Sequence, residues 1–154
     1  MRFGRSGNAL IVLALALAGC ATGNGGQGST SASGIDARTN GATLAQIFFW
    51  RAKPGKLEEY TRYIRERAEP IDAEAQRSGA FVSVTTYMAS DTTVPWTHMR
   101  VFTLRDSTQL RGLSEALTAA GVRLEPDSVK RRQQSEYSAT LRDRVGAIVV
   151  ELVR

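Results

Sequence analysis

The stretch "TLAQIFFWRAKPGK" (43–56) decides the start of the fold. Its first part (43–52) is rich in aromatic residues and carries a β-branched isoleucine, a composition that favours a strand. "PGK" (54–56) has the composition of a turn, and apolar side chains recur after it at steps of three and four residues. This spacing predicts an amphipathic helix of about six turns, which Pro70 should kink or divide and which Gly79 should end.

Local patterns predict the next two strands and a second helix. "AFVSVTTYM" (80–88) and "PWTHMRVFTL" (95–104) are rich in strand-forming residues and are joined by a turn-like segment, which predicts an antiparallel pair. Asp106, with Gln109 three residues later, resembles an N-cap with a capping box. The leucine stripe that follows predicts a helix that stops at Gly121.

The last part of the domain adds a helix and a closing strand. Pro126 and Asp127 are residues that open helices, and they predict a mostly polar helix within 125–144. "AIVVELV" (147–153) predicts the closing strand. The order β-α-β-β-α-(α)-β is that of an α+β, ferredoxin-like fold, a four-stranded antiparallel sheet with helices on one face.

The chain resembles the dimeric α/β-barrel superfamily over residues 43–154. The resemblance rests on the element order, on a strand followed by "KPGK" (53–56) and a long helix, and on a helix that begins directly after "VFTLRD" (101–106). This superfamily includes domains of the antibiotic-biosynthesis-monooxygenase type and NIPSNAP-like domains. The resemblance implies a homodimer in which two sheets pair face to face into a barrel, with a ligand or active site in each subunit.

The N-terminal residues have the order of an export signal. Arg2 and Arg5 precede an unbroken apolar run (9–18), which has the length of a signal-peptide core and is too short to span a bilayer. "LAGC" (17–20) then ends in Cys20, the only cysteine of the chain. This segment resembles the lipobox of bacterial lipoproteins. The resemblance implies cleavage before Cys20, a diacylglycerol on its sulfur, and an acyl chain such as palmitate on the new N-terminus.

These patterns divide the chain into three segments. Residues 1–19 are the predicted lipoprotein signal peptide, and residues 20–41 begin with the lipidated Cys20 and continue as a Gly- and Ser-rich flexible tether. Residues 42–154 are the predicted dimeric α/β-barrel domain. The lipoprotein resemblance implies a cell-envelope protein that acylated Cys20 holds in the lipid bilayer. Because Ala21 rather than aspartate follows the cysteine, it implies the outer membrane, facing the periplasm, if the cell is Gram-negative.

Composition argues against several partners. The chain has 20 Lys and Arg against 15 Asp and Glu, and this mild excess is spread along the sequence, so we expect no nucleic-acid binding. The chain has one histidine, its single cysteine should be lipidated, and no carboxylate cluster lies near in sequence, so we expect no metal site. The sequence has no Gly-rich phosphate loop, and we expect no cofactor.

Strand alternation sorts the side chains by sheet face. Each strand has an aliphatic set and a mixed aromatic and polar set. We expect the aliphatic sets under the helices and the mixed sets on the opposite face. The mixed face should carry the candidate ligand-binding residues Trp50, Tyr87, Trp96, His98 and Arg100. His98 is also the candidate catalytic base, and Arg100 is a candidate anion contact. In the structural alternative, Glu151 and solvent satisfy both side chains.

Three functions remain open from the sequence. The first is a membrane-anchored envelope lipoprotein whose dimeric domain binds a small, partly aromatic or anionic molecule. The second is a cofactor-independent, monooxygenase-type enzyme acting on an aromatic substrate, with Tyr87, Trp96 and His98 around that substrate. The third is a structural envelope protein whose sheet face only dimerises. An open cavity on that face would argue against the third, because a purely structural face should be packed shut.

Overall fold

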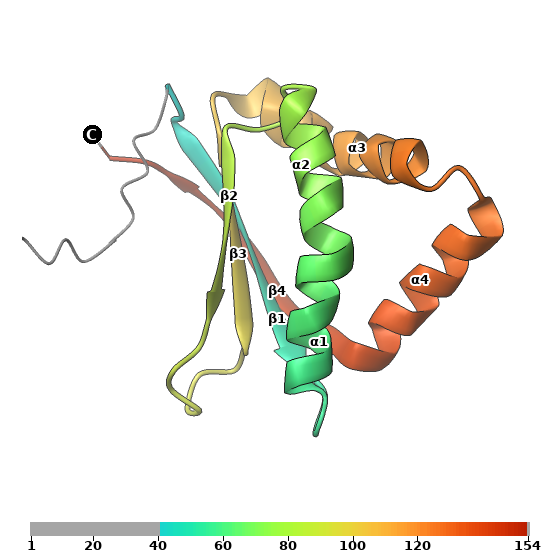
Figure 1. The fold of residues 1–154 in the computed structure, drawn as a ribbon. Helices are drawn as coiled ribbons and strands as arrows, with labels where there is room; N and C mark the ends of the chain where they lie inside the picture. The colour runs from blue at the N-terminus through green and yellow to red at the C-terminus, as the bar shows by residue number, and fades with distance from the viewer. Residues whose placement is uncertain (1–40, 154) are drawn as a thin grey trace, which may run out of the picture. The chain divides into compact units, whose positions relative to one another are not determined.

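Four strands form one antiparallel sheet within residues 41–153, the part of the chain that the computed structural model describes (Figure 1). In chain order the strands are β1 (Leu44–Ala52), β2 (Ser83–Met88), β3 (His98–Leu104) and β4 (Arg142–Glu151). They lie in the order β2-β3-β1-β4, so β3 and β1 are central and β2 and β4 are edges. The predicted signal peptide, Cys20 and the tether up to residue 40 lie outside the described residues.

The helices lie on one side of this sheet (Figure 1). They are α1 (Leu57–Tyr63), a π-helix (Ile64–Ala68), α2 (Glu69–Arg77), α3 (Ser107–Leu124) and α4 (Ser128–Leu141). The first three are continuous in sequence, and we call them together the first helical segment (57–77). The element order and the antiparallel sheet confirm the predicted α+β, ferredoxin-like fold.

Pro70 divides the first helical segment, as the sequence predicts. The backbone N–H of Glu69 donates to the carbonyl of Ile64, so the chain completes a wide π-turn just before the proline. Pro70 then lies in the first turn of α2, a position at which a helix does not need the backbone N–H that proline lacks. The π-turn therefore accommodates Pro70 without ending the helical segment.

Two aspartates begin the later helices, as their sequence positions predict. The Asp106 carboxylate accepts hydrogen bonds from the backbone N–H groups of Thr108 and Gln109, at 2.8 and 3.0 Å. Asp127 caps α4 in the same way. Each carboxylate satisfies donors that have no partner inside the helix, so both helix starts are fixed by local sequence.

Several predicted boundaries are wrong. β2 begins at Ser83 rather than at residue 80, and β3 begins at His98 rather than at residue 95. α3 does not stop at Gly121 but continues to Leu124. The backbone of Gly121 does not take the positive φ of a glycine that ends a helix, so the helix continues through it. β4 begins at Arg142 rather than at residue 147, because its first, polar residues pair with the end of β1. An edge strand tolerates such charged side chains.

The hydrophobic core lies between the helices and the sheet. Phe102 on β3 is buried there and makes edge-to-face contacts with Phe81 and Phe48, at centroid distances of 5.1 and 5.8 Å. A second, smaller cluster contains Tyr60 and Ile64 of the first helical segment. The face of the sheet that carries Phe102 is therefore the face under the helices.

The predicted assignment of sheet faces is wrong for β1, β3 and β4. Directly paired residues share a face, and the mixed sets of β1 and β3 pair with each other: Gln46 with Phe102, Phe48 with Arg100, and Trp50 with His98. Because Phe102 is in the core, these mixed sets face the helices. The mixed set of β4 is in register with them and therefore lies on the same face. β2 differs, because its aliphatic set, which includes Val84, lies under the helices as predicted. Alternation separates two faces but does not identify the one that helices cover.

Candidate functional site

His98, the first residue of β3, is almost fully buried, with 1% of its surface exposed. Its Nε2 lies 3.0 Å from Oγ1 of Thr61 on α1, and its Nδ1 lies 3.0 Å from Oγ1 of Thr97. Thr61 donates its hydroxyl hydrogen to the carbonyl of Leu57, at 2.7 Å, so it accepts from Nε2–H. These partners fit a neutral ring with its proton on Nε2. Burial lowers the pKa of His98, which favours the same neutral form.

These contacts occupy both ring nitrogens of His98. A general base needs a lone pair directed at its substrate, and Nδ1 of His98 instead lies 3.0 Å from the Thr97 hydroxyl, which also lies 3.3 Å from the carbonyl of Trp50. The ring also packs edge-on to Tyr60, with centroids 4.6 Å apart. The role of His98 as a catalytic base stays a prediction, and its contacts favour a role in holding α1 against the sheet.

Arg100 on β3 forms a buried ion pair with Asp72 on α2. Its Nη2 donates to Oδ2 of Asp72, and its Nε donates to Oγ1 of Thr86, at 3.3 Å. Burial raises the pKa of Asp72 to about 6, and the guanidinium of Arg100 lowers it by less. The alternative in which Glu151 satisfies Arg100 is wrong, because Glu151 lies on β4 and β1 separates that strand from β3.

A groove runs between the first helical segment and β2, and His98 is part of its lining. It combines two adjoining hollows of about 170 and 300 Å3, which share Thr61, Arg65 and Met88. The smaller hollow is also lined by Ile64, Glu69, Thr86 and His98. The larger hollow is also lined by Leu57, Glu58 and Arg62. We call this the His98 groove. Its wall mixes apolar side chains with hydroxyls and with charges of both signs.

The candidate ligand-binding residues do not share one face. Trp50, His98 and Arg100 lie under the helices, on the same face of the sheet. Tyr87 lies on the outer face of β2, and Trp96 lies in the loop between β2 and β3. The structure therefore brings three of them together and separates the other two. Whether any of them binds a ligand stays a prediction.

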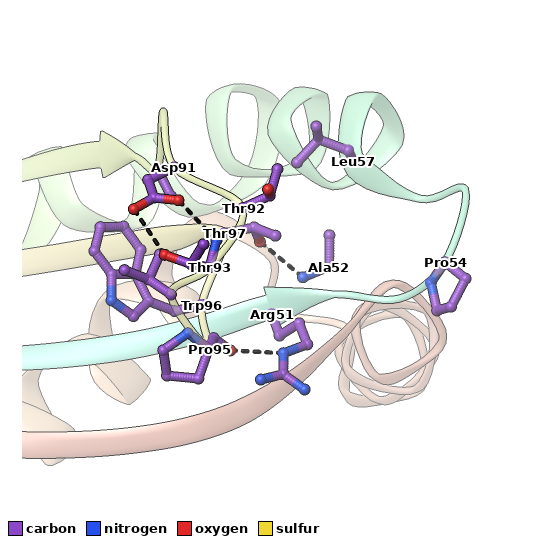
Figure 2. A pocket seen from close by; sticks show the side chains of 12 residues that line it. Arg51, Ala52, Pro54, Leu57, Asp91, Thr92, Thr93, Pro95, Trp96 and Thr97 are labelled. Atoms are coloured by element: carbon purple, nitrogen blue, oxygen red, sulfur yellow. Dashed lines mark hydrogen bonds between the residues drawn. The ribbon is translucent and has the colours of Figure 1, made fainter.

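Trp96 lines another hollow, of about 540 Å3, between the β2–β3 loop and the end of β1 (Figure 2), which shares Leu57 with the His98 groove. The polar side chains around it bond within the loop region. Asp91 accepts from the N–H and the hydroxyl of Thr93, at 2.8 and 2.7 Å, and Nε of Arg51 donates to the carbonyl of Pro95, at 2.6 Å. Because these groups are already engaged, the hollow is a weaker candidate site than the His98 groove.

Sequence reasoning missed the helix side chains that partner β3. Asp72 follows Ala68 by four residues and precedes Ala75 by three, so it lies on the same stripe as these alanines of the predicted helix. A carboxylate inside an apolar stripe is the signal that could have found it. Thr61 gives no such signal, because threonine in a helix commonly bonds to its own backbone, as Thr61 also does.

Two further features bear on the sequence expectations. Within residues 41–153, no group of three or more His, Cys, Asp or Glu side chains is placed to hold a metal ion. None of the helices in the same range is both long and apolar enough to cross a bilayer. The predicted lipid anchor concerns Cys20, which lies outside this range.

No protein-family model matches the chain, and no curated protein matches it. Several solved structures resemble it at low sequence identity. HapK from Hahella chejuensis is 12% identical, with a TM-score of 0.49 over 71% of this chain and 92% of that one. A Bacteroides thetaiotaomicron protein of unknown function, called a possible oxidoreductase, is 14% identical, with a TM-score of 0.47 over 73% of this chain and 99% of that one. A dimeric protein of unknown function and ferredoxin-like fold from Bacteroides fragilis is 11% identical, with a TM-score of 0.48 over 71% and 96%. At this level of similarity, none of them assigns an activity to this chain.

Proposed function

We propose that the chain is a lipid-anchored envelope protein whose homodimeric domain binds a small, partly aromatic or anionic molecule in the His98 groove. Its anchor is acylated Cys20, and its place in a Gram-negative cell is the periplasmic face of the outer membrane. The observation that carries the binding proposal is the buried Asp72–Arg100 pair beside the groove. Apolar residues of similar size often stabilise a core at least as well as such a pair, so its presence supports a functional role.

Thr86 connects this ion pair to the groove. Its Oγ1 accepts from Nε of Arg100, and its side chain lines the groove. The bond to Arg100 uses a lone pair of the oxygen, and no hydrogen bond within residues 41–153 uses the hydroxyl hydrogen. Arg65, on the π-helix, adds a positive charge to the same wall. Both features suit a ligand with an anionic or hydrogen-bond-accepting group.

The outer face of the sheet supports the proposed dimer. It carries the aliphatic sets of three strands, including Ile47, Val101 and Ile148, which are in register across β1, β3 and β4. No helix of the described residues covers this face (Figure 1). Packing against the same face of a second copy would remove these side chains from water.

Native mass spectrometry of the chain purified from its own host tests both parts of the proposal. We expect twice the mass of the mature, acylated chain, together with a discrete extra mass that denaturation removes. The Arg65→Glu variant should lose the extra mass, because it reverses a charge in the groove wall. The matched variant Arg67→Glu, on the same π-helix but outside the groove, should keep it. Both arginines are exposed, so both variants should fold.

Three results would contradict this account. A wild-type spectrum without any extra mass would contradict ligand binding. A single-chain mass would contradict the dimer. Equal loss of the extra mass from both arginine variants would mean that the molecule is not held in the groove.

A further inference from the structure

A further cavity, of about 510 Å3, lies between α2, α3 and α4, and it shares no lining residue with the His98 groove. Tyr63, Ile71 and Leu117 give it an apolar side. Ser135 and other polar residues of α4 give it a polar side, and Arg142, the first residue of β4, also lines it. Its volume lies in the range of sites for small organic ligands.

Contacts at the end of α4 hold this helix in place beside the cavity. The hydroxyl of Tyr137 donates to Oε1 of Glu59 on α1, at 2.7 Å. The Tyr137 ring also packs edge-on to Tyr63, with centroids 6.0 Å apart. Nζ of Lys53 donates to the carbonyl of Ala139, at 2.8 Å. Because these contacts join α4 to the first helical segment and to the end of β1, the cavity is a fixed part of the fold.

Arg142 is a cation without a carboxylate partner in the described residues. Its guanidinium is stacked on Trp50, with Cζ 3.5 Å from the ring centroid, and its Nε donates to Oγ of Ser138, at 3.0 Å. The guanidinium is also hydrogen-bonded to Tyr60, but no carboxylate within residues 41–153 pairs with it. A guanidinium has five N–H groups, and those that Ser138 and Tyr60 leave over are available to a ligand in the cavity that Arg142 lines.

The other arginine of the cavity is already engaged. Nη1 of Arg131 donates to the carbonyls of Glu125 and Pro126, both at 2.7 Å, where α3 ends. The cavity therefore offers one guanidinium that no carboxylate of the described residues neutralises, which suits a single negative charge. A planar carboxylate matches the fork of a guanidinium with two parallel hydrogen bonds. The apolar side of the cavity suits a ligand with an apolar body.

We propose that this cavity is a second ligand site that binds an organic monocarboxylate. The carboxylate lies on the terminal nitrogens of Arg142, and the apolar body lies against Tyr63, Ile71 and Leu117. The proposal does not depend on the His98 groove, because the two sites share no residue.

Fluorine NMR titration of the full chain with para-fluorophenylacetate tests the proposal. The wild type should bind this carboxylate at least about tenfold more tightly than the uncharged para-fluorophenylacetamide, because only the carboxylate makes charge-assisted hydrogen bonds. Arg142→Gln should weaken carboxylate binding by a similar factor. Arg144→Gln is the matched control, since Arg144 lies on the same strand, stacks over Phe48 and does not line the cavity. It should change the affinity by less than about twofold.

A second variant keeps the test valid if Arg142→Gln does not fold. Ser135→Trp fills the cavity from an exposed position of α4, so it should abolish binding while the melting temperature stays near that of the wild type. Arg65→Glu, in the other site, should leave carboxylate binding unchanged. Failure of the wild type to bind at millimolar concentrations, equal affinity for carboxylate and amide, or binding that survives both cavity variants would overturn the proposal.

Discussion

Replacing Asp72 with alanine should lower the free energy of unfolding by about 3 to 5 kcal/mol. The variant leaves the guanidinium of Arg100 buried under the helices without its carboxylate, and a buried charge without a partner is costly. Urea denaturation followed by circular dichroism measures the loss. Glu66→Ala is the matched control, because it removes an exposed carboxylate from the same helical segment. It should change the free energy by less than about 0.5 kcal/mol.

The double variant Asp72→Leu with Arg100→Met tests whether the loss of stability comes from the unpaired charge. Because it removes both charges, it should recover most of the stability that the single variant loses. A single variant that loses less than about 1 kcal/mol would contradict the buried ion pair, since a solvent-exposed pair contributes no more than that.

The ion pair also makes stability depend on pH. Burial raises the pKa of Asp72 from 3.8 to about 6, with Glu69 raising it further and Arg100 opposing the shift. The folded state therefore holds this proton more tightly than the unfolded chain does, which stabilises the fold fully below pH 3.8. This contribution, about 3 kcal/mol, is lost as the pH rises through 6. Measured against Asp72→Asn, the wild type should lose most of that contribution between pH 4 and pH 7, and a constant difference would contradict the shift.

Replacing Cys20 with serine should abolish lipidation and leave an uncleaved precursor. The serine hydroxyl is a far weaker nucleophile than a thiolate, so the diacylglycerol transfer that precedes cleavage should not occur. Intact-mass spectrometry should find a lipid mass on the wild type, which should begin at Cys20, and none on the variant. Ala21→Ser is the matched control, because it changes the neighbouring residue and keeps the thiol.

Membrane fractionation gives a second readout of the same variant. The wild type should remain with membranes, because two or three acyl chains hold a protein far more firmly than one. A wild type without lipid on Cys20, together with a serine variant that fractionates like it, would remove the basis of the proposed localisation.

Local rules predicted the parts of the fold that local chemistry determines. Asp106 and Asp127 cap helices because their carboxylates reach nearby N–H groups, and Pro70 interrupts a helix because it has no N–H to donate. The order of the elements follows from such signals, and it was sufficient for the ferredoxin-like fold. Gly121 was misread because a glycine ends a helix only where its backbone takes a positive φ, and Gly121 does not.

The candidate site was harder to predict because its contacts are tertiary. The alternation in β3 placed His98, Arg100 and Phe102 on one face correctly, but it could not show that helices cover that face. We assumed that the more aliphatic face is the buried one. The structure shows the opposite for β3. Its face with Arg100 is the buried one, because Asp72 on the covering helix supplies a carboxylate for that arginine. Arg142 was missed for a related reason, since β4 begins earlier than its apolar run.

A crystal structure of the chain purified from its own host tests the central claim most directly, because it locates the bound molecule. The account predicts electron density for a small molecule in the His98 groove, within hydrogen-bonding distance of the Thr86 hydroxyl and close to Arg65. It also predicts that the outer faces of two sheets meet in the same crystal. An empty groove, with a small molecule bound between the outer faces of the sheets instead, would contradict the account.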